Sequence, residues 1–271
     1  MHRPIACCLF WLLAAAVHAA LPETPLFRTY GVAEGLPSSS VNALAQDSRG
    51  YLWLATDDGL ARYDGVGFRV WQHDPADPGS LPGNLVQALH VDARDRVWVA
   101  IEGQGFAMLE PDGMHFRQFR HANTPAMGED DVFAFASTPD GALWFGTFGG
   151  GLYRMDAHGS LKHFQHADAD PRSLPDTNVL SLTVDTHGEL WVATTAGAAH
   201  WNGRGFERVD APGLAGAMVY AITAEPGGRL WFSAKSGLFL REVGGRLRAL
   251  HWNPDTDEPR VTGLLRDRDG G

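Results

Sequence analysis

The stretch DTHGELWVAT, residues 185–194, decides the fold because its frame occurs five times along the chain. The tryptophan is the fixed point of the frame, and successive copies lie 45, 46, 47 and 40 residues apart, at Trp53, Trp98, Trp144, Trp191 and Trp231. Twelve positions before each tryptophan a valine opens an alternating run that predicts a strand, at Val41, Val86, Val132, Val179 and Val219. A period of this length indicates a repeat architecture.

A tight turn is predicted just before each tryptophan. Three positions ahead of it stand Gly50, Asp95, Gly141, Gly188 and Gly228. Glycine adopts positive φ without strain and aspartate tolerates it, so the one exception is compatible with the same turn. Six positions ahead an acid recurs at Asp47, Asp92, Asp185 and Glu225, whereas Thr138 breaks the pattern.

Each repeat predicts four strands in about 45 residues, which is typical of a β-propeller blade. The tryptophan opens the second strand, a glycine-bearing turn leads to a third, and aromatic runs such as residues 68–71 and 116–119 mark the fourth. We therefore expect an all-β propeller with five complete four-stranded blades, in which the five tryptophans are structural anchors packed between blades. Residues 27–30 resemble an orphan fourth strand, and residues 261–271 restart the frame of a sixth blade.

The N-terminus has the pattern of a signal peptide. Arg3 precedes an uncharged stretch over residues 5–17, and Val17-His18-Ala19 resembles a cleavage motif. The stretch is too short to span a membrane as a helix. We predict a signal peptide over residues 1–19 and a propeller sensor domain over residues 20–271 that is incomplete at its C-terminus. Cys7 and Cys8 both lie in the signal peptide, so the exported chain has no cysteine for a disulfide, a zinc site or a nucleophile.

The net charge and the distribution of Lys and Arg bear on which molecules this protein can bind. The formal net charge is −10, and the Lys and Arg residues are scattered along the sequence. Nucleic acid is excluded as a partner on this basis, because binding it needs clustered cations. The acidic balance also disfavours anionic ligands unless Arg and Lys are focused at one mouth of the propeller.

Several segments resemble the two-component regulator propeller family. They are GLPSSSV at 35–41, DTHGELWVAT at 185–194, and the connection HDPADPGSLP at 73–82, which recurs as HADADPRSLP at 166–175. The resemblance implies a periplasmic sensor propeller followed by a membrane helix and a cytoplasmic histidine kinase or diguanylate cyclase. It further implies anchoring of the full-length protein in the inner membrane and a homodimer, because signalling through one helix per chain usually needs a pair.

Ligand recognition is expected on the turns that follow the tryptophan strands, because these turns can converge at one mouth of a propeller. Side chains that differ from blade to blade in these turns are Asp57, Asp58, Glu102, Gln104, Phe148 and Lys235. Such variation suits a specificity surface, although ordinary solvated turns vary as well. The ligand class is an unidentified small molecule or oligosaccharide, and we expect no catalytic residue, cofactor or metal in this segment.

Two other classes of protein share the propeller fold. A glycosidase would need an arginine cluster, a tyrosine such as Tyr220 and a carboxylic acid at the mouth, and no matching arginine set falls on the inner positions. A metal-dependent lyase would need a catalytic histidine, but His163 and His166 flank a strand edge where their side chains diverge. A protein-binding scaffold is the third possibility, and the residues do not distinguish it from a sensor.

Overall fold

A computed structural model of the chain describes residues 27–250 and residue 261. It divides into two units, residues 1–30 and residues 31–271. The predicted signal peptide over residues 1–19 lies outside the described residues, and so does the predicted start of a sixth blade apart from Val261. No helix among the described residues is long and apolar enough to cross a membrane.

In the first unit, the described residues Phe27–Tyr30 have neither strand nor helix conformation. The Arg28 guanidinium lies over the Tyr30 ring, 4.8 Å from its centroid. The predicted fourth strand over residues 27–30 is therefore wrong here. The aromatic pattern indicates a strand, but an extended segment becomes one only when its backbone bonds to a neighbour.

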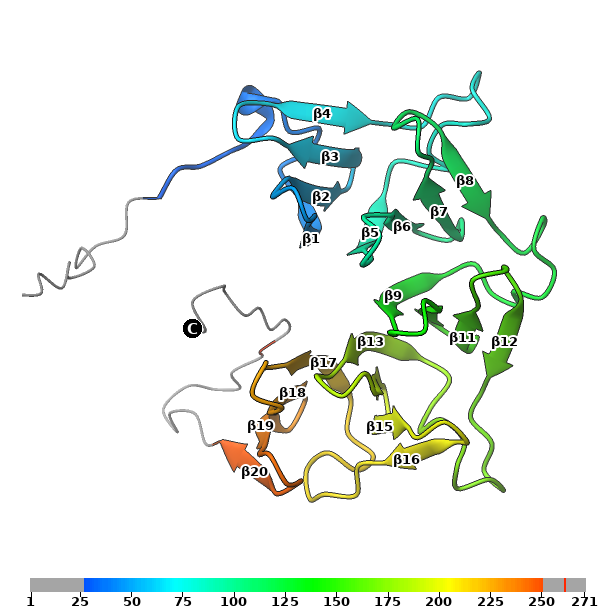
Figure 1. Ribbon diagram of the computed structural model, residues 1–271, viewed down its shortest axis with the longest axis vertical. Coiled ribbons are helices and arrows are strands. Elements are labelled where there is room, and N and C mark those ends of the chain that lie inside the picture. Colours follow the sequence, from blue (N-terminus) through cyan, green and yellow to red (C-terminus); the bar gives the residue numbers. More distant parts are fainter. Residues whose placement is uncertain (1–26, 251–260, 262–271) are drawn as a thin grey trace, which may run out of the picture. The chain divides into compact units, whose positions relative to one another are not determined.

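The second unit contains a short 3-10 helix, Val32–Glu34, and five antiparallel sheets, each of four consecutive strands. Figure 1 shows the sheets in chain order. The first strands are β1 (Val41–Gln46), β5 (Val86–Val91), β9 (Val132–Ser137), β13 (Val179–Val184) and β17 (Val219–Ala224). The second strands are β2 (Leu52–Thr56), β6 (Val97–Ile101), β10 (Leu143–Thr147), β14 (Leu190–Thr194) and β18 (Leu230–Ala234).

The third strands are β3 (Gly59–Tyr63), β7 (Phe106–Leu109), β11 (Gly151–Met155), β15 (Gly197–Trp201) and β19 (Gly237–Arg241). The fourth strands are β4 (Phe68–Trp71), β8 (Phe116–Phe119), β12 (Leu161–Phe164), β16 (Phe206–Arg208) and β20 (Leu247–Leu250). Each first strand begins at the valine of the repeat frame. The prediction of an all-β propeller with five four-stranded blades is confirmed for the described part of the chain.

The first strands lie beside one another in chain order, with β1 next to β5, β5 next to β9, β9 next to β13 and β13 next to β17. Each of them pairs with its second strand through a register irregularity at its first residues. A bulge of this kind re-aims the side chain beside it. The residue after each valine, such as Asn42 or Gln87, therefore lies at a position where it can reach the next sheet.

The core consists of layers between successive sheets. Trp53 packs in one cluster with Val97 and Val99 of the second sheet, and Trp144 in another with Val179 and Leu190 of the fourth. Trp53, Trp98, Trp144 and Trp191 are each at most 2% exposed. Trp231 is half-buried, and no further sheet among the described residues covers its face. The tryptophans thus lie between blades wherever a following blade is described.

The turn before each tryptophan is held by a side chain six residues ahead of it. The indole N–H donates to Asp47 at 3.1 Å, to Asp92 at 3.1 Å, to Thr138 at 3.1 Å, to Asp185 at 3.0 Å and to Glu225 at 2.5 Å. Asp95 has φ of 57° and is the one non-glycine residue with positive φ in the described part of the chain. The expectation that it replaces a turn glycine in the same conformation is therefore confirmed.

Candidate functional site

The turns between second and third strands lie at the same end of each sheet as the connections that lead to the next sheet, and we call this end the connection end. Antiparallel pairing requires this arrangement, since first strands begin and fourth strands finish there. The turns between first and second strands lie at the opposite end, which we call the tryptophan-turn end. The predicted ligand residues all belong to the connection end.

The first residue of every connection-end turn is anchored in the same way. Its backbone N–H donates to the carbonyl of the residue just before the first strand of its own sheet. The pairs are Asp57 to Ser40 at 3.4 Å, Glu102 to Leu85 at 3.1 Å, Phe148 to Asp131 at 2.9 Å, Thr195 to Asn178 at 3.2 Å and Lys235 to Met218 at 2.8 Å. Five different side chains are thus presented from equivalent backbone positions.

A second set of bonds joins a turn to the connection entering the next sheet. The N–H groups of Gly59, Gly105 and Gly151 donate to the carbonyls of Asn84, Asp130 and Thr177, at 2.7, 2.8 and 2.8 Å. These bonds run between successive sheets. They hold each turn and the following connection as one hydrogen-bonded unit.

The connections carry a further internal bond from histidine. The Nδ1 atoms of His73, His121 and His166 lie 2.6, 2.5 and 2.8 Å from the carbonyl oxygens of Leu81, Met127 and Leu174. The Leu174 carbonyl and the Asp168 carboxylate raise the pKa of His166 above its ordinary value, because both accept from the ring. The connection end is therefore built from loops with defined hydrogen bonding.

The structure divides the six predicted ligand residues into two groups. Asp57, Glu102, Phe148 and Lys235 occupy the first turn position and are exposed. Asp58 instead bonds within the loops, and Gln104 is exposed but packs against a neighbouring loop. The Asp58 carboxylate accepts from Asn84 Nδ2 at 2.8 Å and from Gln72 Nε2 at 3.0 Å. Gln104 lies against Gly83, where an added Cβ would come within 2.7 Å of its Nε2.

No hydrogen bond or ion pair joins any two of these six side chains within the described residues. Asp57 accepts from Asn42 Nδ2 at 2.9 Å, and the Phe148 ring lies 5.7 Å from that of Phe133. The six residues therefore define a surface rather than a closed pocket. Such a surface can recognise a ligand through separate contacts from several blades.

Sequence reasoning missed two amides that tie successive sheets together at this end. Asn42 Nδ2 donates to the Val86 carbonyl at 3.0 Å, and Gln87 Nε2 donates to the Val132 carbonyl at 2.8 Å and to Asp131 at 3.0 Å. Both amides follow the valine that opens a first strand. Their shared place in the repeat frame is the signal that could have found them. Thr195, the remaining first-turn residue, was also missed.

His163 and His166 do not form a shared site. His163 Nε2 lies 2.6 Å from the Gly150 carbonyl, and its ring stacks on Tyr153 with centroids 4.1 Å apart. His166 contacts the Leu174 carbonyl within its own connection, between β12 and β13. Within residues 27–250, no group of three or more His, Cys, Asp or Glu side chains is placed to hold a metal ion.

Two segments of this chain match a family of known repeats. Residues 35–58 and 173–196 match the family model described as two component regulator propeller. A stretch of 73 residues is 36% identical to a histidine kinase from Formosa agariphila. This stretch is 27% of this chain and 5% of the kinase.

Solved structures share the fold at low sequence identity. The extracellular domain of a protein described as a hybrid two component system from B. thetaiotaomicron superposes with a TM-score of 0.66 and 20% identity, over 89% of this chain and 39% of that domain. Virginiamycin B lyase from Staphylococcus aureus superposes with a TM-score of 0.61 and 15% identity, over 78% of this chain and 70% of the lyase. At these identities the superpositions establish the fold alone.

Proposed function

Because residues 35–58 and 173–196 match the two component regulator propeller model, we propose that this chain is the extracytoplasmic ligand-sensing propeller of a bacterial signalling receptor. The predicted signal peptide over residues 1–19 supports export to the periplasm. The chain spans 5% of the similar histidine kinase and 39% of the similar extracellular domain. The second part of the proposal is that the chain belongs to a longer receptor. We propose that this receptor is anchored in the inner membrane, forms a homodimer and carries a histidine kinase or diguanylate cyclase.

The observation that carries the proposal is the equivalent anchoring of five different side chains at the connection end. A carboxylate at Asp57 and Glu102, an aromatic ring at Phe148 and an ammonium at Lys235 are exposed at the same backbone position, whereas the Thr195 hydroxyl at that position is buried. Solvated turns also vary, but solvation alone does not need an aromatic ring as exposed as Phe148, at 45%. A fixed frame with varied chemistry is what recognition of a specific small molecule or oligosaccharide requires.

A thermal-shift screen of the purified protein against mono- and oligosaccharides and amino acids tests ligand binding. For any ligand found, we expect Glu102→Gln, Lys235→Met and Phe148→Ala to weaken binding while the unfolding temperature without ligand stays within a few degrees. Glu189→Gln is the matched control, since Glu189 is exposed on a turn at the tryptophan-turn end. A ligand that binds equally well to the three variants would refute the proposed site.

Export needs a separate test in cells. Fusing residues 1–30 to alkaline phosphatase lacking its own leader should give phosphatase activity, because that enzyme becomes active only after export. If a ligand from the screen were instead converted to product by the purified protein, the chain would be an enzyme such as a glycosidase or lyase. Capture of a protein partner with no response to small molecules would indicate a scaffold.

A further inference from the structure

A cleft between the first sheet (β1–β4) and the second sheet (β5–β8) gathers arginines that are scattered in the sequence. It lies at the tryptophan-turn end, opposite the candidate site, and has a volume of ≈ 300 Å³. Five arginines line it, namely Arg49, Arg62, Arg69, Arg94 and Arg96. The whole chain has 22 Lys and Arg and a net charge of −10, so five arginines at one cleft are a local positive charge on an acidic protein.

The acids near the cleft are already engaged. Asp47 and Asp92 accept from the tryptophan indoles and pair with Arg49 at 3.4 Å and Arg96 at 2.6 Å. Asp95 accepts from the backbone and hydroxyl of Ser48, and Glu110 pairs with Arg117 at 2.9 Å. Arg62, Arg69 and Arg94 have no ion pair within the described residues. The Arg94 Nη2 atom lies beside Gly141 of the third sheet, where an added Cβ would come within 3.4 Å of it, so the unpaired guanidinium groups of this cleft are those of Arg62 and Arg69.

Arg62 has the less satisfied guanidinium of the two. Its guanidinium lies 4.5 Å from the centroid of the Tyr51 ring and 5.6 Å from that of Trp53. Its Nε is buried without a hydrogen-bond partner in the described structure. A buried donor without an acceptor is unfavourable, and aromatic rings do not replace a carboxylate as the acceptor.

The repeat does not require arginine at this position. Arg62 is the cross-strand partner of Trp53, and the equivalent partners in the other sheets are Met108, Arg154, His200 and Leu240. Met108 and Leu240 show that an apolar side chain satisfies the packing. Arg154 pairs with Asp140 at 2.6 Å. Arg62 instead stands directly across from a second arginine, Arg69. Like charges opposite each other destabilise a sheet. Arg69 bonds to the second sheet, but the Arg62 Nε has no acceptor that would offset this cost.

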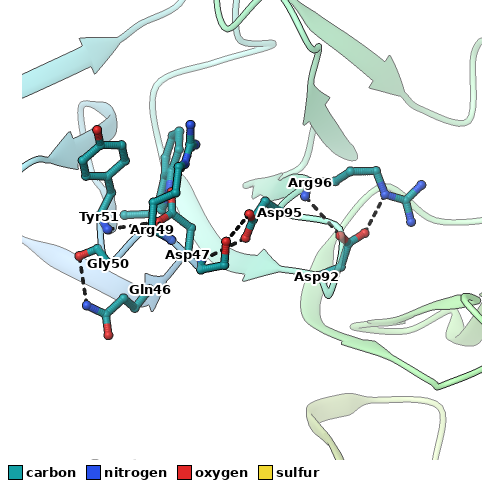
Figure 2. Close-up of polar contacts among 10 residues, drawn as sticks. Gln46, Asp47, Arg49, Gly50, Tyr51, Asp92, Asp95 and Arg96 are labelled. Carbon is teal, nitrogen blue, oxygen red and sulfur yellow. Dashed lines mark hydrogen bonds and ion pairs between the residues drawn. The ribbon is translucent and has the colours of Figure 1, made fainter.

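The cleft is held in a defined geometry. Arg69 Nη2 and Trp71 Nε1 donate to the Gly113 carbonyl of the second sheet at 2.7 and 3.1 Å. At the rim, Asp95 of the second sheet bonds to Ser48 of the first, and Arg96 is held by Asp92, as Figure 2 shows for the labelled Asp92, Asp95 and Arg96. Trp53 and Trp71 stack with centroids 5.3 Å apart and give the cleft an aromatic wall.

We propose that this cleft binds a small organic anion, which places carboxylate, sulfate or phosphate oxygens on Arg62 and Arg69 and a flat or apolar body against Leu109 and Pro111 of the cleft wall. Guanidinium groups pair with such oxyanions through two parallel hydrogen bonds, and the Arg62 Nε supplies a donor that is otherwise unused. The site lies at the other end of the sheets from the candidate ligand surface. It does not rest on the proposed sensing function.

Isothermal titration calorimetry of the purified protein at low ionic strength tests the proposal with two probes, sodium sulfate and benzene-1,3,5-tricarboxylate. We expect saturable binding of at least one probe. Binding of sulfate would indicate recognition of the oxyanion itself, and binding of the tricarboxylate alone would indicate that contact of the ring with the cleft wall is also needed. Glucose, which is uncharged, should give no binding heat at this site.

Arg62→Met should raise the dissociation constant of the bound anion about tenfold or more, since it removes charge-assisted hydrogen bonds. Methionine is the residue that the second sheet has at the equivalent position, Met108, so the packing should be retained. Arg154→Met, its counterpart in the third sheet, should leave the dissociation constant unchanged. Arg69→Gln changes an exposed strand residue of the same cleft and gives a second test if Arg62→Met folds poorly. Absence of saturable binding by both probes, or affinity that is the same in Arg62→Met and Arg69→Gln as in the wild type, would overturn the proposal.

Discussion

Trp98 donates its indole N–H to the carboxylate of Asp92 at 3.1 Å, and the other oxygen of that carboxylate accepts the backbone N–H groups of Arg94 and Arg96 at 2.9 and 3.1 Å. One aspartate therefore connects the turn to the tryptophan that packs between the second and third sheets. Figure 2 shows Asp92 with Arg96 beside the equivalent turn of the first sheet. The acid six residues ahead of the tryptophan recurs because it serves both the turn and the core.

Replacing this carboxylate should destabilise the domain. Asp92→Ala leaves the buried indole N–H and two backbone N–H groups without their acceptor, and we expect a loss of about 2 to 3 kcal/mol in the free energy of unfolding. Chemical denaturation monitored by tryptophan fluorescence measures it. Asp112→Ala is a matched control, because Asp112 accepts similar backbone bonds in an exposed turn but contacts no tryptophan. An equal loss in both variants would contradict the role assigned to the Asp92–Trp98 bond.

The same carboxylate should make stability depend on pH. Burial alone would raise the pKa of Asp92, but the bonds from Trp98, Arg94 and Arg96 outweigh it and hold the pKa below the ordinary 3.8. The stabilisation is therefore complete above pH 3.8 and is lost as pH falls through the folded-state value. Denaturation curves between pH 6 and pH 2 should show a steeper loss of stability in the wild type than in Asp92→Asn. Parallel pH profiles would show that Asp92 does not titrate in this way.

Asp95 combines positive φ with a bond between two sheets, and substitutions separate these roles. Asp95→Gly keeps the left-handed conformation and loses the contact with Ser48, whereas Asp95→Ala loses the contact and adds backbone strain. We expect Asp95→Ala to unfold a few degrees below Asp95→Gly, and Asp95→Gly to unfold below the wild type. Melting followed by circular dichroism orders the three proteins. A reversed order of the two variants would mean that strain at this turn is unimportant.

The repeat frame made most of the fold predictable. Every first strand begins at the valine that lies twelve residues before a tryptophan, because the turn and strand lengths between them hardly vary. The frame also placed Asp57, Glu102, Phe148 and Lys235 at one turn position. It could not show that Asp58 is used by Asn84 and Gln72, because those partners come from a connection of irregular conformation.

The arginine cleft was beyond sequence reasoning for a related physical reason. Arg62 and Arg69 approach through pairing of β3 with β4, whereas Arg94 comes from a turn of the second sheet. No fixed spacing connects residues that meet across two packed sheets. The expectation of scattered cations therefore describes the sequence correctly, while the fold brings five of them to one cleft.

Two glycines in the connection-end turn of the second sheet need positive φ, but only one of them also lacks room for a side chain. Gly103 and Gly105 both have positive φ, 61° and 75°, so alanine is strained at either position. At Gly105 an added Cβ would lie 2.1 Å from the Phe119 carbonyl oxygen, whereas at Gly103 it would meet nothing within 4 Å. The Gly105 N–H also bonds to Asp130 at 2.8 Å, which a shift of the turn would break. We therefore expect Gly103→Ala to cost about 1 kcal/mol in the free energy of unfolding and Gly105→Ala at least twice as much. Equilibrium denaturation of the two variants provides the comparison.

Equal losses would mean that the close approach of residue 105 to Phe119 relaxes without cost. The turn that carries Glu102 would then be less rigidly placed than its hydrogen bonds indicate.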